Sequence, residues 1–339
     1  MCARIVVTGI LLAAMTDARP ALDAAEPLAP PTPTAASSVR PFSMPRTEQW
    51  SMESRANRVF EISLALPKAP PPARGYPIIY ALDAGTSFAT VVETARNQEV
   101  LFGPVVVVGI GYPSEAEIAN RLFDLTPATD RATLPAPPPG GWGAIGGADA
   151  FLRFIQDELK PRIEARTSVD KSHQALFGHS LGGLFVLHAL FTRPDAFETY
   201  VAGSPSIWWG NRMIFKELDA FKQAQAASRH QHRLLVTAGG LETALSPEEL
   251  RASLAMNLPN PAFEFLKLKM VANAQELAGQ LQPLSTRGLQ VAFTIFDGET
   301  HNSVIPAYVS RGVRFTLSGW SHPQVTGQQP CGVGDCGQH

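Results

Sequence analysis

The stretch QALFGHSLGGLFVLHAL, residues 174–190, decides how this chain folds. Its first four residues form a mostly apolar run typical of a strand, and residues 183–190 have the composition of a helix. Between them lies G-x-S-x-G, whose glycines permit a tight turn that would hold the Ser180 hydroxyl exposed at the carboxyl end of the strand. Strand, glycine-flanked serine and helix in this order predict a nucleophile elbow. The alternative is a glycine-rich turn that carries an inert serine.

Strands and helices alternate on both sides of the elbow. The pattern predicts further strands at residues 59–66, 77–82, 105–110, 199–202, 233–238 and 289–296. The runs 77–82 and 105–110 are nearly all apolar, which suits strands covered on both faces. Helices are expected at residues 88–100 and 148–166. The fold class is therefore α/β, with a mostly parallel central sheet and helices on both faces.

The composition suits one large domain. The chain has 339 residues, of which 45% are hydrophobic and 17% charged, and its formal net charge is −2. Because no stripe of lysine and arginine occurs, we expect neither nucleic acid nor an anionic membrane as a partner. The cysteines are Cys2, Cys331 and Cys336, so the core is expected to hold no disulfide framework, although the last two residues could pair in an oxidising compartment.

The two ends of the chain differ from its middle. Residues 1–47 combine a short apolar run at 5–15 with a Pro- and Ala-rich segment, and they are expected to act as a signal-like leader and linker. The protein is therefore expected to be periplasmic or secreted, and a cytoplasmic location is the alternative. No stable membrane insertion is expected, because the apolar run is too short to span a bilayer. The catalytic domain is expected at 48–320, and 321–339 is expected to be a disordered tail.

Two further segments bear on function. The irregular stretch 113–147 is too long for an ordinary connection, so it is either a lid or pocket wall beside Ser180 or a surface loop. Residues 332–337 formally match G-x-G-x-x-G, but no strand precedes them and no helix follows. A dinucleotide site is therefore rejected.

A serine nucleophile needs a base, which in this class of fold follows it in the sequence and is usually histidine. His301 comes just after the last expected strand, at the same sheet edge as Ser180, and is the predicted base. The other histidines after the serine lie in the elbow helix, before a strand or in the tail: His188, His230, His232, His322 and His339. A surface histidine in a turn is the alternative interpretation of His301.

The orienting acid is expected directly after the penultimate strand, and Glu242 is the acidic residue just past that strand. A carboxylate at this point would hold the imidazole tautomer and stabilise the imidazolium. Glu242 could instead be the first residue of a helix over 242–250, where its negative charge would interact favourably with the helix dipole. Asp297 and Glu299 are alternative candidates because they lie in the same loop as His301. A further alternative is a serine–histidine pair that works with little assistance from an acid.

The oxyanion hole is predicted from two backbone donors. One is the N–H of Leu181, directly after the serine, and the other is the N–H of Ala84 or Gly85, which follow the strand 77–82. Asp83 is interpreted as a residue that fixes this turn. His179 and His173 are given no required role.

Four ordered motifs are similar to those of one known family. They are YALD at 80–83, RLFDLTP at 121–127, GHSLGGLF at 178–185 and SPSIWW at 204–209. Over roughly residues 49–319 the chain resembles the putative esterase family of α/β hydrolases, which includes the enterobactin and salmochelin siderophore esterases and relatives of esterase D. The resemblance implies the α/β-hydrolase fold and a serine esterase.

The best-known members of that family cleave the trilactone of catecholate siderophores, so the resemblance implies a small-molecule ester substrate of this kind. By the same analogy Arg121, Trp208 and Trp209 would line the substrate site, where indoles stack on aromatic groups and the guanidinium meets an anionic catecholate. The alternatives are a core role for the two tryptophans and an Arg121–Asp124 pair. Leu181 stands where siderophore esterases often have tyrosine, which weakens the inference of substrate.

No cofactor or metal is expected, because the sequence has no H-E-x-x-H, cysteine–histidine ligand cluster or phosphate loop. Competing functions are an acyltransferase, an esterase for another substrate class and an inactive binding protein on the same fold. The residues do not indicate an oligomeric state.

Overall fold

The computed structural model describes residues 42–113, 117–135, 137, 141–225, 231–255, 265 and 267–320. The chain from Met44 onward forms one compact unit. The expected leader up to residue 41, the tail from residue 321 and all three cysteines lie outside the described residues. Among the described residues, no helix is both long and apolar enough to cross a bilayer.

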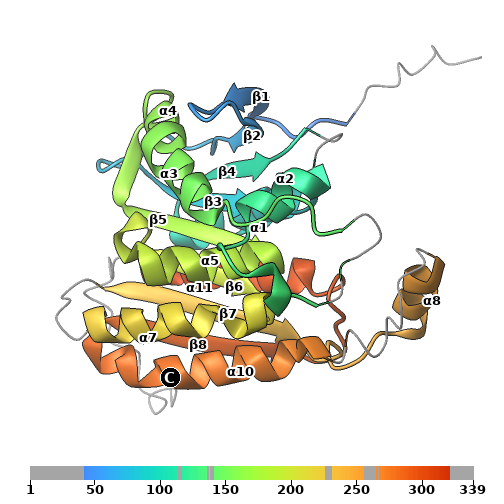
Figure 1. The fold of residues 1–339 in the computed structure, drawn as a ribbon. Helices are drawn as coiled ribbons and strands as arrows, with labels where there is room; N and C mark the ends of the chain where they lie inside the picture. The colour runs from blue at the N-terminus through green and yellow to red at the C-terminus, as the bar shows by residue number, and fades with distance from the viewer. Residues whose placement is uncertain are drawn as a thin grey trace, which may run out of the picture. The chain divides into compact units, whose positions relative to one another are not determined.

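Eight strands form one sheet in the order β1-β2-β4-β3-β5-β6-β7-β8 (Figure 1). Their bounds are β1 Thr47–Glu53, β2 Val59–Ala65, β3 Tyr76–Leu82, β4 Val106–Gly111, β5 Val169–His179, β6 Thr199–Gly203, β7 His232–Gly239 and β8 Leu289–Phe296. β2 pairs antiparallel with β1 and β4, whereas every pair from β4 to β8 is parallel. The predicted mostly parallel sheet is confirmed, with β1 as an additional edge strand that the sequence patterns did not predict.

Helices cover the sheet on both faces. They are α1 Ala84–Phe102, α2 Glu117–Asp124, α3 Ala148–Phe154, α4 Lys160–Glu164, α5 Leu181–Thr192, α6 Trp209–Arg212, α7 Ile214–Gln225, α8 Pro247–Ala255, α10 Met270–Leu281 and α11 Ile305–Trp320. One core packs α3, α5, α7 and α10 against one face, and a second core packs α1 and α11 against the other (Figure 1). Along β3, Ile78 and Tyr80 enter the first core while Ile79 and Ala81 enter the second, which explains the continuous apolar run.

The helix expected at 148–166 is present, with one departure from regular geometry. It continues from α3 to α4 through a π-helical turn, Ile155–Leu159. Pro161 lies just beyond that turn, at the start of α4, where its missing N–H is tolerated.

The segment 113–147 is not simply irregular, because its described part contains α2 and a 3₁₀ turn, Arg131–Thr133. Two hydrogen bonds join its beginning to its end, because Gly146 N–H donates to Thr126 Oγ1 and Gly147 N–H donates to the Phe123 carbonyl. A third joins the segment to the rest of the fold, since Trp209 Nε1 in α6 donates to the Pro127 carbonyl. The described part of the segment is therefore closed on itself and attached to α6.

Candidate active site

Ser180 lies between β5 and α5 with φ 60° and ψ −118°, a conformation that costs a non-glycine residue about 1–3 kcal/mol. The neighbouring glycines make the turn possible. A Cβ on Gly178 would overlap the Gly182 carbonyl oxygen, and one on Gly183 would lie 2.7 Å from the Gly203 carbonyl oxygen. The Ser180 N–H donates to that Gly203 oxygen at 2.9 Å, so the strained turn is tied to the end of β6. This is the geometry of a nucleophile elbow.

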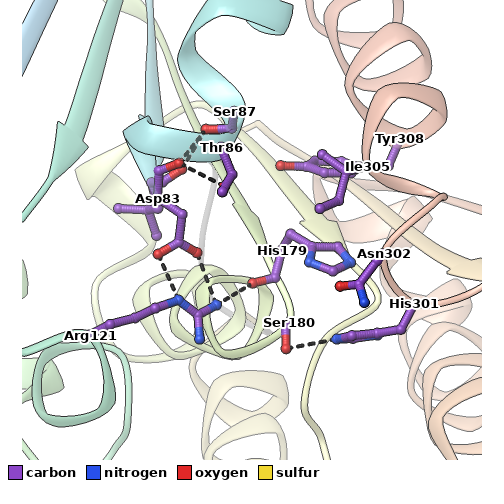
Figure 2. A pocket seen from close by; sticks show the side chains of 11 residues that line it. Asp83, Thr86, Ser87, Arg121, His179, Ser180, His301, Asn302, Ile305 and Tyr308 are labelled. Atoms are coloured by element: carbon purple, nitrogen blue, oxygen red, sulfur yellow. Dashed lines mark hydrogen bonds and ion pairs between the residues drawn. The ribbon is translucent and has the colours of Figure 1, made fainter. Parts of the chain in front are cut away.

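His301 lies in the turn between β8 and α11. Its Nε2 is 2.9 Å from Ser180 Oγ, although the two residues are 121 positions apart in the chain (Figure 2). They meet because parallel strands end at the same edge of the sheet, and β5 and β8 both belong to the parallel part. The distance is within reach of proton transfer from hydroxyl to imidazole.

Glu242 lies behind the histidine, in the turn after β7, and is only 2% exposed. Its Oε2 is 3.3 Å from His301 Nδ1, an ion-pair distance at which the angles of a hydrogen bond are not met. The helix expected to begin at Glu242 begins instead at Pro247. Of the competing acids, Asp297 is exposed and Glu299 accepts a hydrogen bond from Ser303 Oγ. The structure therefore brings Glu242 to the imidazole.

His179, which had no predicted role, packs against the same imidazole. Its ring lies 4.6 Å from that of His301 and stacks on Tyr308 at 5.6 Å. Burial, together with the charges of His301 and Arg121, holds the pKa of His179 well below its usual value. A neutral ring beside His301 avoids a second positive charge there. Its position inside G-x-S-x-G was visible in the sequence, but its packing against a turn far away in the chain was not.

Arg121 reaches the site from α2. Its guanidinium forms two hydrogen bonds to the Asp83 carboxylate, Nε–Oδ1 at 2.8 Å and Nη2–Oδ2 at 3.0 Å, and Nη2 also donates to the His179 carbonyl at 3.3 Å (Figure 2). The alternative pairing with Asp124 is wrong, because Asp124 is bound by Arg58 at 2.6 Å. Burial raises the pKa of Asp124 to about 6 against the opposing effect of Arg58.

The predicted oxyanion donors come from two different turns. Leu181 directly follows the serine at the start of α5, as required. Ala84 and Gly85 instead line a separate hollow with residues of β1 and β2. Asp83 adopts a left-handed conformation, φ 53°, that redirects the chain after β3, and the Ala84 side chain then faces the glycines of β4. The second oxyanion donor, expected to be the backbone N–H of Ala84 or Gly85, stays a prediction.

The two tryptophans predicted to line the substrate site differ in their exposure. Trp209 is completely buried and its Nε1 donates to the Pro127 carbonyl at 3.2 Å, so it belongs to the core rather than to a substrate surface. Trp208 is half-buried, and its ring lies 6.3 Å from that of Trp142. Trp142 comes from the segment 113–147, and no sequence pattern singled it out.

A pocket of about 260 Å³ opens beside Ser180 (Figure 2). It is lined by Leu82, Asp83, Thr86, Ser87, Arg121, His179, Ser180, His301, Asn302, Ile305 and Tyr308. These residues come from the carboxyl ends of β3 and β5, from the first turn of α1, from α2, from the turn between β8 and α11 and from the start of α11. Within the described residues, no group of three or more metal-ligating side chains gathers.

The parallel sheet, the serine elbow and the histidine at the same sheet edge define an α/β hydrolase. The family model described as "Putative esterase" matches residues 54–279, and the chain belongs to this family. It is a carboxylic ester hydrolase.

Named relatives extend over most of the chain. The chain is 41% identical to the ferri-bacillibactin esterase BesA of Bacillus subtilis, over 81% of this chain and 91% of that protein. It is 34% identical to the siderophore triacetylfusarinine C esterase of Aspergillus fumigatus, over 84% and 97%. The solved structure of the siderophore hydrolase EstA from Aspergillus nidulans matches with a TM-score of 0.71 and 31% identity, over 85% and 99%.

Proposed function

We propose that this enzyme hydrolyses siderophore esters through an acyl-enzyme on Ser180, with His301 as general base and Glu242 as the orienting acid. The observation that carries the proposal is the 2.9 Å separation of Ser180 Oγ and His301 Nε2 beside a pocket. A strained elbow aims the hydroxyl, and a buried carboxylate 3.3 Å from Nδ1 stabilises the imidazolium that forms.

In the acylation step, Ser180 Oγ attacks the ester carbonyl carbon while its proton passes to His301 Nε2. The backbone N–H of Leu181 donates to the oxyanion that develops. When the tetrahedral intermediate collapses, the bond to the alcohol oxygen breaks and that oxygen takes the proton from His301. Water then attacks the acyl-enzyme and gives a proton to His301, which returns it to Ser180 Oγ as the acid leaves.

The names of the relatives support a siderophore as the substrate. A catecholate trilactone is the member of that class we propose. Arg121 lines the pocket, and its bidentate contact with Asp83 fixes the guanidinium plane beside the serine, where an anionic catecholate would approach. Trp208 is half-buried and available for partial stacking, whereas Trp209 no longer belongs to the proposed substrate surface.

The test is hydrolysis of ferric enterobactin, ferric triacetylfusarinine C and p-nitrophenyl butyrate by the wild type and by Ser180→Ala, with products followed by liquid chromatography and mass spectrometry. We expect ring opening of ferric enterobactin by the wild type and a loss of kcat on the order of 10⁴-fold or more in the variant. Cleavage of the butyrate alone would reject the siderophore substrate. Equal rates for the two proteins would reject Ser180 as nucleophile.

We also propose that residues 1–47 direct the protein out of the cytoplasm, on the strength of the short apolar run and the Pro- and Ala-rich segment after it. Expression of the full chain in a bacterial host, followed by fractionation and N-terminal sequencing, tests this. Export with removal of the leader is expected. An intact N-terminus retained in the cytoplasm would reject the proposal.

A further inference from the structure

Ser204, the first residue after β6, contacts the acid rather than the nucleophile. It is 1% exposed, and its Oγ donates to Glu242 Oε1 at 2.5 Å. Its backbone is left-handed, φ 40°, a conformation that disfavours residues other than glycine. The Ser204 N–H donates to the Thr237 carbonyl of β7 at 2.8 Å, so the strained residue is held in place.

The second donor to the same carboxylate oxygen is the N–H of Gly239, at 2.9 Å. With two donors on Oε1, the carboxylate cannot rotate without losing both hydrogen bonds, and Oε2 remains on the side of His301 Nδ1. A buried carboxylate also loses its contacts with water, and these two donors replace part of them. The hydroxyl of Ser204 therefore supplies one of the two hydrogen bonds that hold Glu242 in this orientation.

The turn that carries Ser204 also holds the nucleophile. The Gly203 carbonyl accepts the Ser180 N–H at 2.9 Å, and the Ser206 N–H donates to the Ser180 carbonyl at 3.0 Å. Residues 203–206 thus contact the elbow through these backbone bonds and the Ser206 hydroxyl, 3.4 Å from Ser180 Oγ, whereas the Ser204 side chain contacts the acid. A change at Ser204 Oγ alone leaves the contacts with Ser180 in place.

We propose that Ser204 is a positioning residue for the hydrolytic reaction, acting through Glu242 on the orientation of His301. The inference rests on the proposed function, because it presumes that Ser180, His301 and Glu242 perform the chemistry. It predicts that the Ser204 hydroxyl contributes to kcat and contributes nothing once the Glu242 carboxylate has been removed.

The experiment compares Ser204→Ala and Ser204→Gly in the wild-type and Glu242→Gln backgrounds. The readouts are kcat and KM for p-nitrophenyl butyrate, the rate of Ser180 labelling by a fluorophosphonate, and Tm. Glycine removes the same hydroxyl as alanine but accepts φ 40° without strain, so it separates loss of the hydroxyl from backbone strain. Ser63→Ala is the matched control, because Ser63 is a buried serine on β2, outside the serine pocket.

We expect both Ser204 variants to lose kcat and labelling rate by about 10- to 100-fold with little change in KM, and Ser63→Ala to match the wild type. In the Glu242→Gln background, removing the hydroxyl should change kcat by less than about twofold, because the two residues act as a unit. Wild-type kcat in Ser204→Gly, or a full additional loss in the double variant, would overturn the positioning role. If wild-type Ser180 neither labels nor turns over the ester, the proposed function falls and this inference falls with it.

Discussion

Glu242 illustrates how much depends on single residues at this site. Three acids are candidates to orient His301, and two of them, Asp297 and Glu299, lie closer to it in the sequence. Burial decides between them. Asp297 is exposed, whereas the Glu242 carboxylate is enclosed with its Oε2 3.3 Å from the imidazole. An ion pair shielded from water is stronger than an exposed pair, which makes Glu242 the residue to test.

Replacing Glu242 by glutamine preserves its size but removes its charge. We expect kcat for ester hydrolysis to fall on the order of 10²–10⁴-fold, because the imidazolium loses its stabilising carboxylate and the tautomer of His301 is no longer fixed. Steady-state kinetics on p-nitrophenyl butyrate measures this. Asp297→Asn is the matched control and should stay within about twofold of the wild type. The reverse ranking would assign the role to Asp297.

Helix α5 shows why glycine is required where an element starts at the site. A Cβ on Gly183 would lie 2.7 Å from the Gly203 carbonyl oxygen and 3.0 Å from Pro205 Cα, so a substitution there would push against backbone. Gly279 in α10 is exposed, and a Cβ on it would have no atom within 4 Å. The same change to alanine should therefore have opposite effects in the two helices.

Gly183→Ala is expected to lower the free energy of unfolding by about 1–3 kcal/mol and to reduce activity, because α5 must shift away from the end of β6. Gly279→Ala is expected to raise the free energy of unfolding by up to about 1 kcal/mol through higher helix propensity. Urea unfolding followed by circular dichroism measures both. Equal destabilisation by the two substitutions would contradict this account.

His188 connects three helices through its buried imidazole. From α5, its Nδ1 lies 3.0 Å from both carboxylate oxygens of Glu217 in α7, and its Nε2 lies 3.3 Å from Asp149 in α3. Burial lowers the pKa of His188, but the hydrogen bond and charge of Glu217, together with Asp149, outweigh burial and raise the pKa above its usual value. Protonated His188 thus stabilises the packing of α3 and α7 on the elbow helix.

Because the pKa is raised in the folded state, this stabilisation is fully present below the unfolded value, about 6.5, and is lost as pH rises through the higher folded value. His188→Gln should therefore lower Tm most at pH 5.5 and least at pH 9. Differential scanning fluorimetry across this range measures the difference between variant and wild type. His173→Gln serves as a comparison, since His173 in β5 pairs with Asp170 at 2.8 Å and packs on Trp320 instead. A Tm difference for His188→Gln that grows with pH would reject the assignment.

At the scale of the whole molecule, the site exists only when distant strand ends meet. Ser180 follows β5, Glu242 follows β7 and His301 follows β8. We expect loss of fluorophosphonate labelling on heating to coincide with the loss of tertiary structure by near-ultraviolet circular dichroism, because opening either side of the sheet separates the serine from its base. Labelling that persists above the structural midpoint would show that the serine reacts without the assembled sheet.

The elbow, the strand pattern and the order serine, acid, histidine could be predicted from local sequence. The surroundings of Ala84 and Gly85 could not be predicted, because the left-handed turn at Asp83 is stabilised by Arg121 from another element. The assignment of Trp209 to the substrate site was wrong, because the motif shows that an indole is present but does not show whether the indole is exposed. Ser204 also belonged to a recognised motif, and its contact with Glu242 depended on the pairing of β6 with β7.

The α/β class, the parallel core and the position of the serine turn follow from the order of residues alone, because apolar periodicity and glycine placement act over a few neighbouring residues. Three features required the folded chain: which acid reaches His301, the binding of Asp83 by Arg121, and the packing of His179 against the imidazole. These choices depend on distances between residues tens to more than a hundred positions apart. Such distances arise only when parallel strands align their carboxyl ends at one edge of the sheet.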